Sequence, residues 1–141
     1  PRTKAPDLEY PLPDGSTNWL VALKSEPVIL YFHTPECGEW AAVKENLTAS
    51  PIINGLQQKG QLKILALYPD EDLKTYRQHL SKMPAAWINA YDKGSVIKTE
   101  ELYDLKAIPT LYLLDKDKTV LLKDVTFEAL EAFLEQKHRN K

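Results

Sequence analysis

Residues 27–40 read PVILYFHTPECGEW, and this stretch joins a strand pattern to a helix pattern. Residues 27–33 form a continuous apolar run rich in aromatic and β-branched side chains, which is typical of a strand buried on both faces. Thr34 and Pro35 then suit the cap and the first position of a helix. Cys37, the single cysteine of the chain, falls in the first turn of that predicted helix.

The rest of the chain continues this alternation of strand and helix patterns. Pro51 should kink or restart the first helix, which the pattern extends to Gly60. Residues 7–23 predict a hairpin or extended arm that turns at Asp14-Gly15 and leads into a short helix capped by Ser16, Thr17 or Asn18. The later patterns predict a strand at 62–68, a helix at 70–83, a short strand at 87–90, a short helix near 100–103, a hairpin at 109–124 and a closing helix from Thr126.

This order of elements predicts one α/β domain over residues 1–141. The βα units favour a mixed, mainly parallel central sheet flanked by helices on both faces, with a β extension at the N-terminal end. The late hairpin adds an antiparallel edge, and the closing helix follows it. The core should span about residues 8–136, and residues 137–141 should form a frayed basic tail.

Composition excludes several classes of function. The chain has 141 residues and a net charge of −2, which gives no electrostatic footprint for nucleic acid. No apolar run approaches the roughly 20 residues that a membrane span requires. Three scattered histidines and one cysteine give no metal-ligand spacing, and no glycine-rich phosphate loop is present, so we expect neither a metal nor a cofactor.

Cys37 has two interpretations on local sequence alone. At a helix start, the helix dipole and free N–H groups favour the reactive thiolate, whereas the negative charges of Glu36 and Glu39 oppose it. His33 could be a thiolate partner, although a strand-end histidine commonly makes a local hydrogen bond. The alternative is that Cys37 is a small, partly buried apolar residue.

A second motif, AIPT at residues 107–110, stands directly before the predicted hairpin. A proline at the mouth of a strand cannot donate to the ladder, so Pro109 marks an edge, a bulge or a special turn. Taken with Cys37, this motif resembles the thioredoxin fold, and in particular the bacterial TlpA/ResA and AhpC/TSA-like branch. The arm YPLPDGS, the extra unit LKILALYPDEDLKTYRQHL and the segment YDLKAIPTLYLLDKDKTVLLKD carry the closer resemblance.

The resemblance implies roles for individual residues. Cys37 matches the attacking cysteine of the C-x-x-C motif, and Gly38 and Glu39 fill the two intervening positions. Pro109 matches the cis-proline that lies against that cysteine, which puts Ile108 at an edge where substrate peptides dock.

Two positions depart from the family pattern. Trp40 stands where the resolving cysteine should be, so the motif is degraded to C-G-E-W. Tyr31 takes the place of the buried acid that helps to deprotonate that second cysteine. The two departures agree, because the acid has no task without a second thiol.

These departures leave three hypotheses. The first is a thiol-disulfide oxidoreductase-like protein of the bacterial periplasm or cell envelope, acting on protein or small-molecule thiols and disulfides through Cys37 alone. The second is a redox-inactive binding module that uses the Cys37, Trp40 and Ile108 surface. The third is a peroxiredoxin-like peroxidase, in which Thr34 and Cys37 fit the motif but Leu30 replaces its proline.

Overall fold

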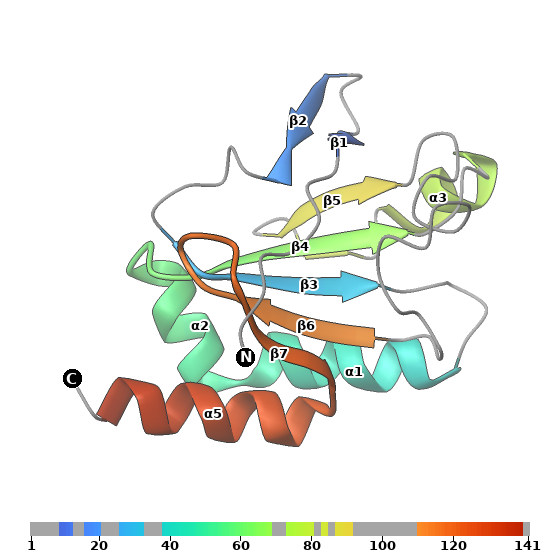
Figure 1. Ribbon diagram of the computed structural model, residues 1–141. Coiled ribbons are helices and arrows are strands. Elements are labelled where there is room, and N and C mark those ends of the chain that lie inside the picture. Colours follow the sequence, from blue (N-terminus) through green and yellow to red (C-terminus); the bar gives the residue numbers. More distant parts are fainter. Residues whose placement is uncertain are drawn as a thin grey trace.

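Figure 1 shows the computed structural model of the chain, in which a twisted sheet lies between helices on one face and a small hairpin on the other. The structure describes residues 9–12, 16–20, 26–32, 38–68, 73–80, 83–84, 87–91 and 110–139. Its elements, in chain order, are β1 (Glu9–Pro11), β2 (Thr17–Trp19), β3 (Val28–Phe32), α1 (Gly38–Ala49), α2 (Pro51–Gln58), β4 (Lys63–Tyr68), α3 (Leu73–Leu80), β5 (Ile88–Tyr91), β6 (Thr110–Leu114), β7 (Val120–Val125) and α5 (Phe127–Arg139).

The central sheet has the strand order β5-β4-β3-β6-β7. β3 is parallel to β4, and β4 is parallel to β5, whereas β6 is antiparallel to both of its neighbours. All five residues of β3 are buried, as the continuous apolar run predicts for a strand with neighbours on both sides and cover on both faces. The predicted mixed α/β architecture is therefore confirmed.

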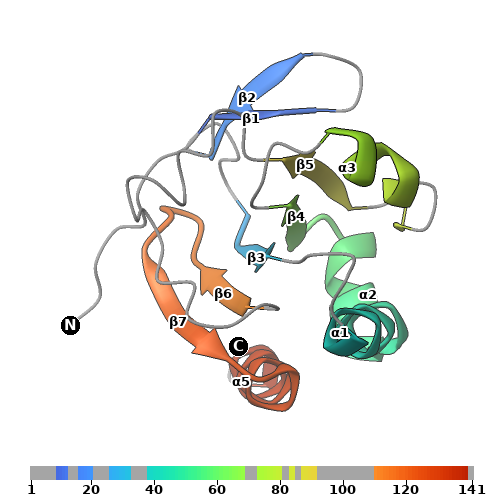
Figure 2. The same cartoon turned by 90° about the vertical axis from the view of Figure 1, so that its right-hand side faces the viewer.

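Alternation along the strands divides the apolar residues between two cores. Ile29 and Tyr31 of β3 face the helices and join the helix-side core, which also takes Leu47, Ile53, Leu130 and Leu134 from α1, α2 and α5. Helices α1, α2 and α5 lie together on this face, as Figure 2 shows in a view turned by 90°.

The opposite face carries the arm-side core. Val28, Leu30 and Phe32 of β3 pack there with Tyr10 of β1 and with Leu20, which follows β2. Within the described residues, the N-terminal hairpin therefore covers the face on which a second helical layer is predicted. None of the described helices is long and apolar enough to cross a membrane.

A break between α1 and α2 occurs where Pro51 predicts it. Ser50 caps α2: its Oγ accepts a hydrogen bond from the Ile53 N–H at 3.4 Å, and Pro51 occupies the first turn. The same hydroxyl donates to Glu131 Oε2 at 2.7 Å, which ties the break to α5. The kink is thus held by a buried polar contact, and α2 and α5 are fixed side by side.

The structure corrects one expectation. The helix predicted to begin at Ser16, Thr17 or Asn18 is wrong at its start, because Thr17–Trp19 form β2 and pair with β1. Helix α5 extends to Arg139, so it overlaps the expected tail, whose fraying stays a prediction. The short helix near 100–103 lies outside the described residues.

Candidate functional site

The register of the central strands pairs two residues that adjoin, in sequence, the segments carrying the predicted site. Phe32, the last residue of β3, is the register partner of Thr110, the first residue of β6. Residues 33–37 follow Phe32, and residues 101–109 precede Thr110. Cys37, Thr34, Ile108 and Pro109 lie in these segments, outside the described residues, so their arrangement stays a prediction.

Helix α1 begins at Gly38, one residue after Cys37. The main chain of Gly38, Glu39 and Trp40 is helical, whereas the side chains of Glu39 and Trp40 are outside what the structure describes. The free N–H groups and positive end of a helix dipole lie at its first turn and favour a nearby anion. The place of Cys37 in the first turn of a helix capped by Thr34 lies outside the described residues and stays a prediction.

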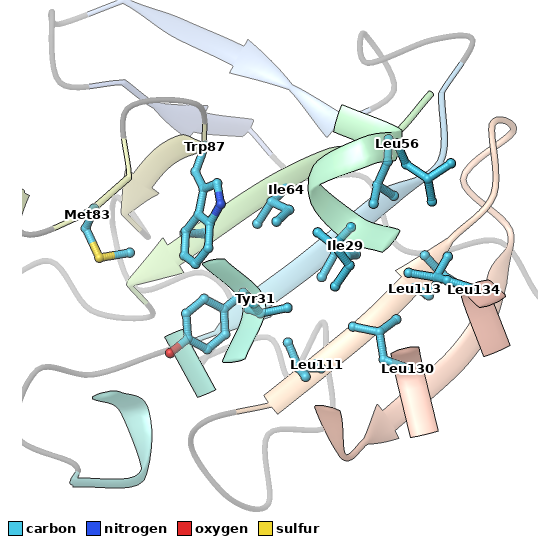
Figure 3. Close-up of a cluster of buried hydrophobic side chains, with 14 residues drawn as sticks. Ile29, Tyr31, Leu56, Ile64, Met83, Trp87, Leu111, Leu113, Leu130 and Leu134 are labelled. Atoms are coloured by element: carbon cyan, nitrogen blue, oxygen red, sulfur yellow. The ribbon is translucent and has the colours of Figure 1, made fainter. Parts of the chain in front are cut away.

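Tyr31 is the second-to-last residue of β3, at the position where the family pattern has a buried acid. The residue is fully buried, and its ring meets the ring of Trp87 edge to face, with centroids 5.8 Å apart. Figure 3 shows Tyr31, Trp87, Met83 and Leu111 directed into the same cluster of the helix-side core. Tyr31 is buried, as its place in the apolar run predicts, and its ring packs against an aromatic neighbour.

Buried carboxylates are absent from the described part of the core. Its buried polar or charged side chains are those of Ser50 and Lys118, which belong to the α2 cap and to the β6–β7 turn. The described residues also contain no group of three side chains suited to hold a metal ion. Acid-base help for a thiol therefore does not come from the described core.

Three tyrosines close the ends of the parallel strands, a feature that the sequence reading missed. Tyr68 and Tyr91 are register partners at the ends of β4 and β5. Tyr76 of α3 stacks on Tyr68 with centroids 6.2 Å apart and contacts Tyr91 at 5.1 Å. The only sequence signal was that Tyr68 and Tyr91 each end an apolar strand, which does not indicate that a helix joins them.

Burial changes the acidity of Tyr76. Loss of solvent, with a smaller contribution from Tyr91, raises the pKa of Tyr76 to about 12. Its hydroxyl is buried and has no hydrogen-bond partner in the described part of the chain. Tyr76 is therefore neutral at physiological pH and does not exchange protons. Its ring packs against the ends of β4 and β5 and makes this end of the sheet more rigid.

Comparisons with known proteins agree with this architecture. A family model described as thioredoxin-like matches residues 25–120. A thioredoxin-like protein from Bacteroides caccae is 46% identical with a TM-score of 0.92, and the match covers 95% of this chain and 48% of that one. The chain thus spans about half the length of that protein.

Two further solved structures are informative. The C-terminal domain of an uncharacterized protein from Bacteroides fragilis is 46% identical with a TM-score of 0.91, covering 94% of this chain and 95% of that one. A proposed thiol:disulfide interchange protein DsbE from Chlorobium tepidum is 29% identical with a TM-score of 0.72, covering 99% and 95%. No curated protein matches the chain. The family model covers more than half of the sequence, and two solved structures are 46% identical to the chain. The chain therefore belongs to the thioredoxin-like family.

Proposed function

We propose that this protein performs thiol-disulfide exchange with Cys37 as its single attacking nucleophile. The observation that carries the proposal is the register pair of Phe32 and Thr110, because the segments that hold Cys37 and Pro109 adjoin these two paired residues. The similarity to a proposed interchange protein, at 29% identity over nearly the whole chain, supports the same chemistry.

The proposed reaction follows from a single thiol. The Cys37 thiolate attacks one sulfur of a client disulfide, that S–S bond breaks, and the other client sulfur leaves as a thiolate. The chain has no second cysteine to resolve the mixed disulfide. A client thiol or a small-molecule thiol must attack it and release Cys37. Release by the client's own thiol isomerises disulfides without net oxidation, whereas release by external thiols reduces the client and oxidises those thiols.

Client docking is assigned to the segment before β6. We propose that the main chain at Ile108 pairs with an extended client segment, and that Pro109 shapes the surface against Cys37. Trp40, in the first turn of α1, offers an aromatic anchor beside the thiol. These three residues and Cys37 would form one surface.

The acidity of Cys37 would depend on opposing influences. A helix N-terminus at Cys37, with Thr34 as its cap, would favour the thiolate, whereas the charge of Glu39 opposes it. Tyr31 supplies no carboxylate from the core. We therefore expect a pKa only modestly below that of a free thiol.

A second candidate function is supported by the same core. Tyr31 fills the position of the acid, and the described core holds no buried carboxylate, as a redox-inactive binding module would allow. The peroxidase hypothesis gains no such support: Leu30, at the position of the peroxidase proline, is fully buried inside β3 between Leu65 and Tyr112.

We further propose that the protein acts in the bacterial periplasm or cell envelope, on protein or small-molecule thiols and disulfides. This rests on the family resemblance and on the bacterial origin of the similar structures. Fractionation of the source bacterium with an antibody to this chain tests it, and recovery in the cytoplasm would contradict it.

The decisive experiment is the rate of iodoacetamide alkylation of Cys37 as a function of pH. The denatured chain is the matched control, because the same single thiol is then free, with a pKa of about 8.5. If the proposal is correct, the native thiol reacts readily, with a midpoint below that of the denatured control. Incubation with glutathione disulfide should then add one glutathione to the native protein and none to the Cys37→Ser variant.

The opposite results favour the binding module. If Cys37 reacts only after unfolding, or titrates at or above the free value, it is not an activated nucleophile. A peroxidase would instead consume hydrogen peroxide and convert Cys37 to a sulfenic acid. Each hypothesis thus predicts a different chemical behaviour of the Cys37 sulfur.

A further inference from the structure

A pocket of about 410 Å³ opens at the edge of the sheet where the parallel strands β3 and β4 begin, opposite to their carboxyl-terminal ends. Its walls combine four leucines from separate elements: Leu56 of α2, Leu62 before β4, Leu113 of β6 and Leu134 of α5. All four belong to the helix-side core and are between 0% and 9% exposed. The pocket is therefore a hollow that lies over the edge of the packed core.

The turn that ends α2 shapes one side of this pocket. Gly60 has a φ of +69°, which a residue without Cβ adopts at little cost, and its N–H donates to Gln57 O at 3.0 Å. The chain then passes Gln61 and enters β4 at Lys63. Gln61 is exposed at the mouth, so the pocket remains accessible from solvent.

Two cations lie at the mouth. Lys116, in the β6–β7 turn, and Lys137, in the last turns of α5, both line the pocket and are exposed. Asp115 also lines it, but its Oδ1 accepts hydrogen bonds from the Asp117 and Thr119 N–H groups, each at 2.9 Å. This carboxylate is thus turned toward the main chain of the turn and keeps its negative charge, whereas Lys116 and Lys137 are the two cations among the described residues that line the pocket.

The turn that carries Lys116 is anchored to the sheet. Lys118 is buried, and its Nζ donates to Glu26 O at 3.0 Å and to Lys116 O at 3.1 Å. The main chain at Lys116 is therefore held beside the start of β3, where Pro27 also lines the pocket. A cation carried by an anchored turn at the rim of an apolar hollow is suited to a ligand with an anionic head and an apolar body.

We propose that this pocket binds a small aliphatic monocarboxylate, with the chain lying over the apolar floor of the pocket and the carboxylate between Lys116 and Lys137. At roughly 30 Å³ per non-hydrogen atom, the volume accepts about a dozen such atoms, which corresponds to an acid of eight to ten carbons. The site is independent of Cys37, and its test is separate from the test of thiol chemistry.

The test uses decanoate, octanoate and 1-octanol below any micelle-forming concentration, titrated into the ¹⁵N-labelled chain. We expect the amide signals of Gln61, Leu113 and Lys116 to shift. Decanoate should bind about three- to fifteenfold more tightly than octanoate, since each buried methylene contributes up to about fourfold. Octanoate should bind more tightly than octanol, and added salt should weaken only the acids.

Variants of exposed residues test the two parts of the pocket without disturbing the core. Lys137→Gln should weaken decanoate binding about two- to fivefold, whereas the matched variant Lys74→Gln, an exposed lysine on α3, should leave it unchanged. Gln61→Trp should block the mouth and abolish binding.

Four outcomes overturn the proposal. If octanol binds as tightly as octanoate, or if Lys137→Gln has no effect, the pocket does not recognise a carboxylate. If the shifts spread over the surface away from Gln61 and Leu113, the ligand binds without a site. If the pocket amides shift on dilution without ligand, a second copy of the chain covers the mouth.

Discussion

Lys118 allows a quantitative test of how the β6–β7 turn is held. The residue has a φ of 64°, a left-handed conformation that a side chain with a Cβ adopts at a cost of roughly 1–2 kcal/mol. Only 4% of its surface is exposed, and its Nζ contacts the carbonyls of Glu26, Lys116 and Asp115 at 3.0, 3.1 and 3.5 Å. The side chain must therefore compensate for the backbone conformation.

Two substitutions separate these contributions. Lys118→Gly removes the left-handed cost but also the contacts of Nζ and the packing of the stem. A hydrogen bond to a charged group contributes about 1.5–3 kcal/mol, and each buried methylene up to about 0.8 kcal/mol. We therefore expect Lys118→Gly to lower the free energy of unfolding by about 1–3 kcal/mol. Lys118→Met keeps the backbone cost and most of the stem but loses the Nζ contacts, so we expect a loss of about 1.5–3 kcal/mol.

Urea denaturation of the wild type and of both variants measures these losses. The exposed neighbour Lys116 provides the control, because Lys116→Met should change the free energy of unfolding by less than about 0.5 kcal/mol. If Lys118→Gly is more stable than the wild type, or if Lys118→Met is equally stable, the Nζ contacts do not outweigh the backbone cost and the reasoning is refuted.

The same variants carry a pH test. Burial lowers the pKa of Lys118 from its ordinary value of 10.5, despite the opposing effects of nearby Glu26, Asp115 and Asp117. Between the lowered value and 10.5 the unfolded chain binds more protons than the folded one, so Lys118 makes stability rise with pH in that window. The stability advantage of the wild type over Lys118→Met should therefore grow as the pH approaches 10, and an advantage that shrinks would contradict the assignment.

Other predictions concern single contacts. Tyr76→Phe removes a buried hydroxyl without a partner among the described residues, so urea denaturation should show no loss and a gain of up to about 1 kcal/mol. Because burial raises the pKa of Tyr76 to about 12, the wild type should lose stability as the pH rises from 10 through 12, and the variant should lose less. Ser50→Ala removes the α2 cap and the contact to Glu131, which should cost about 1–2 kcal/mol in thermal unfolding, whereas Ser50→Thr should retain most of it.

The strands and helices that could be predicted are those whose pattern is set by burial. The apolar run of β3 and the stripe of α5 both report that one or two faces are covered, and this signal is present in the residues themselves. The cap at Thr126 is equally local: its Oγ1 accepts from the Ala129 N–H at 3.1 Å. The confirmed elements are therefore those whose structure is determined by residues close together in the sequence.

The elements that were predicted wrongly depend on contacts with residues far away in the sequence. Ser16, Thr17 and Asn18 resemble a helix cap, but pairing with Glu9–Pro11 makes β2 a strand, and Asn18 Oδ1 accepts from the Trp19 N–H. Likewise, the polar residues around Lys118 predict an exposed turn. Nothing nearby in the sequence indicates that the Lys118 side chain contacts Glu26 O.

The candidate site was predictable only to the extent that the family pattern supplies it. The pairing of Phe32 with Thr110 agrees with that pattern, and the burial of Tyr31 follows from its place in a buried strand. The tyrosine cluster and the leucine pocket could not be predicted, because each joins side chains from three or more elements that no periodicity relates.

The position of β3 at the centre of the sheet has a consequence for biosynthesis. One neighbour of β3 is β4, which is translated soon after it, but the other is β6, which emerges only after α3 and β5. During translation the most apolar strand of the chain therefore waits with one edge unpaired, a state in which chains associate with one another. Holding the growing polypeptide in solution until the last third has been made is then a task for the ribosome surface and for chaperones.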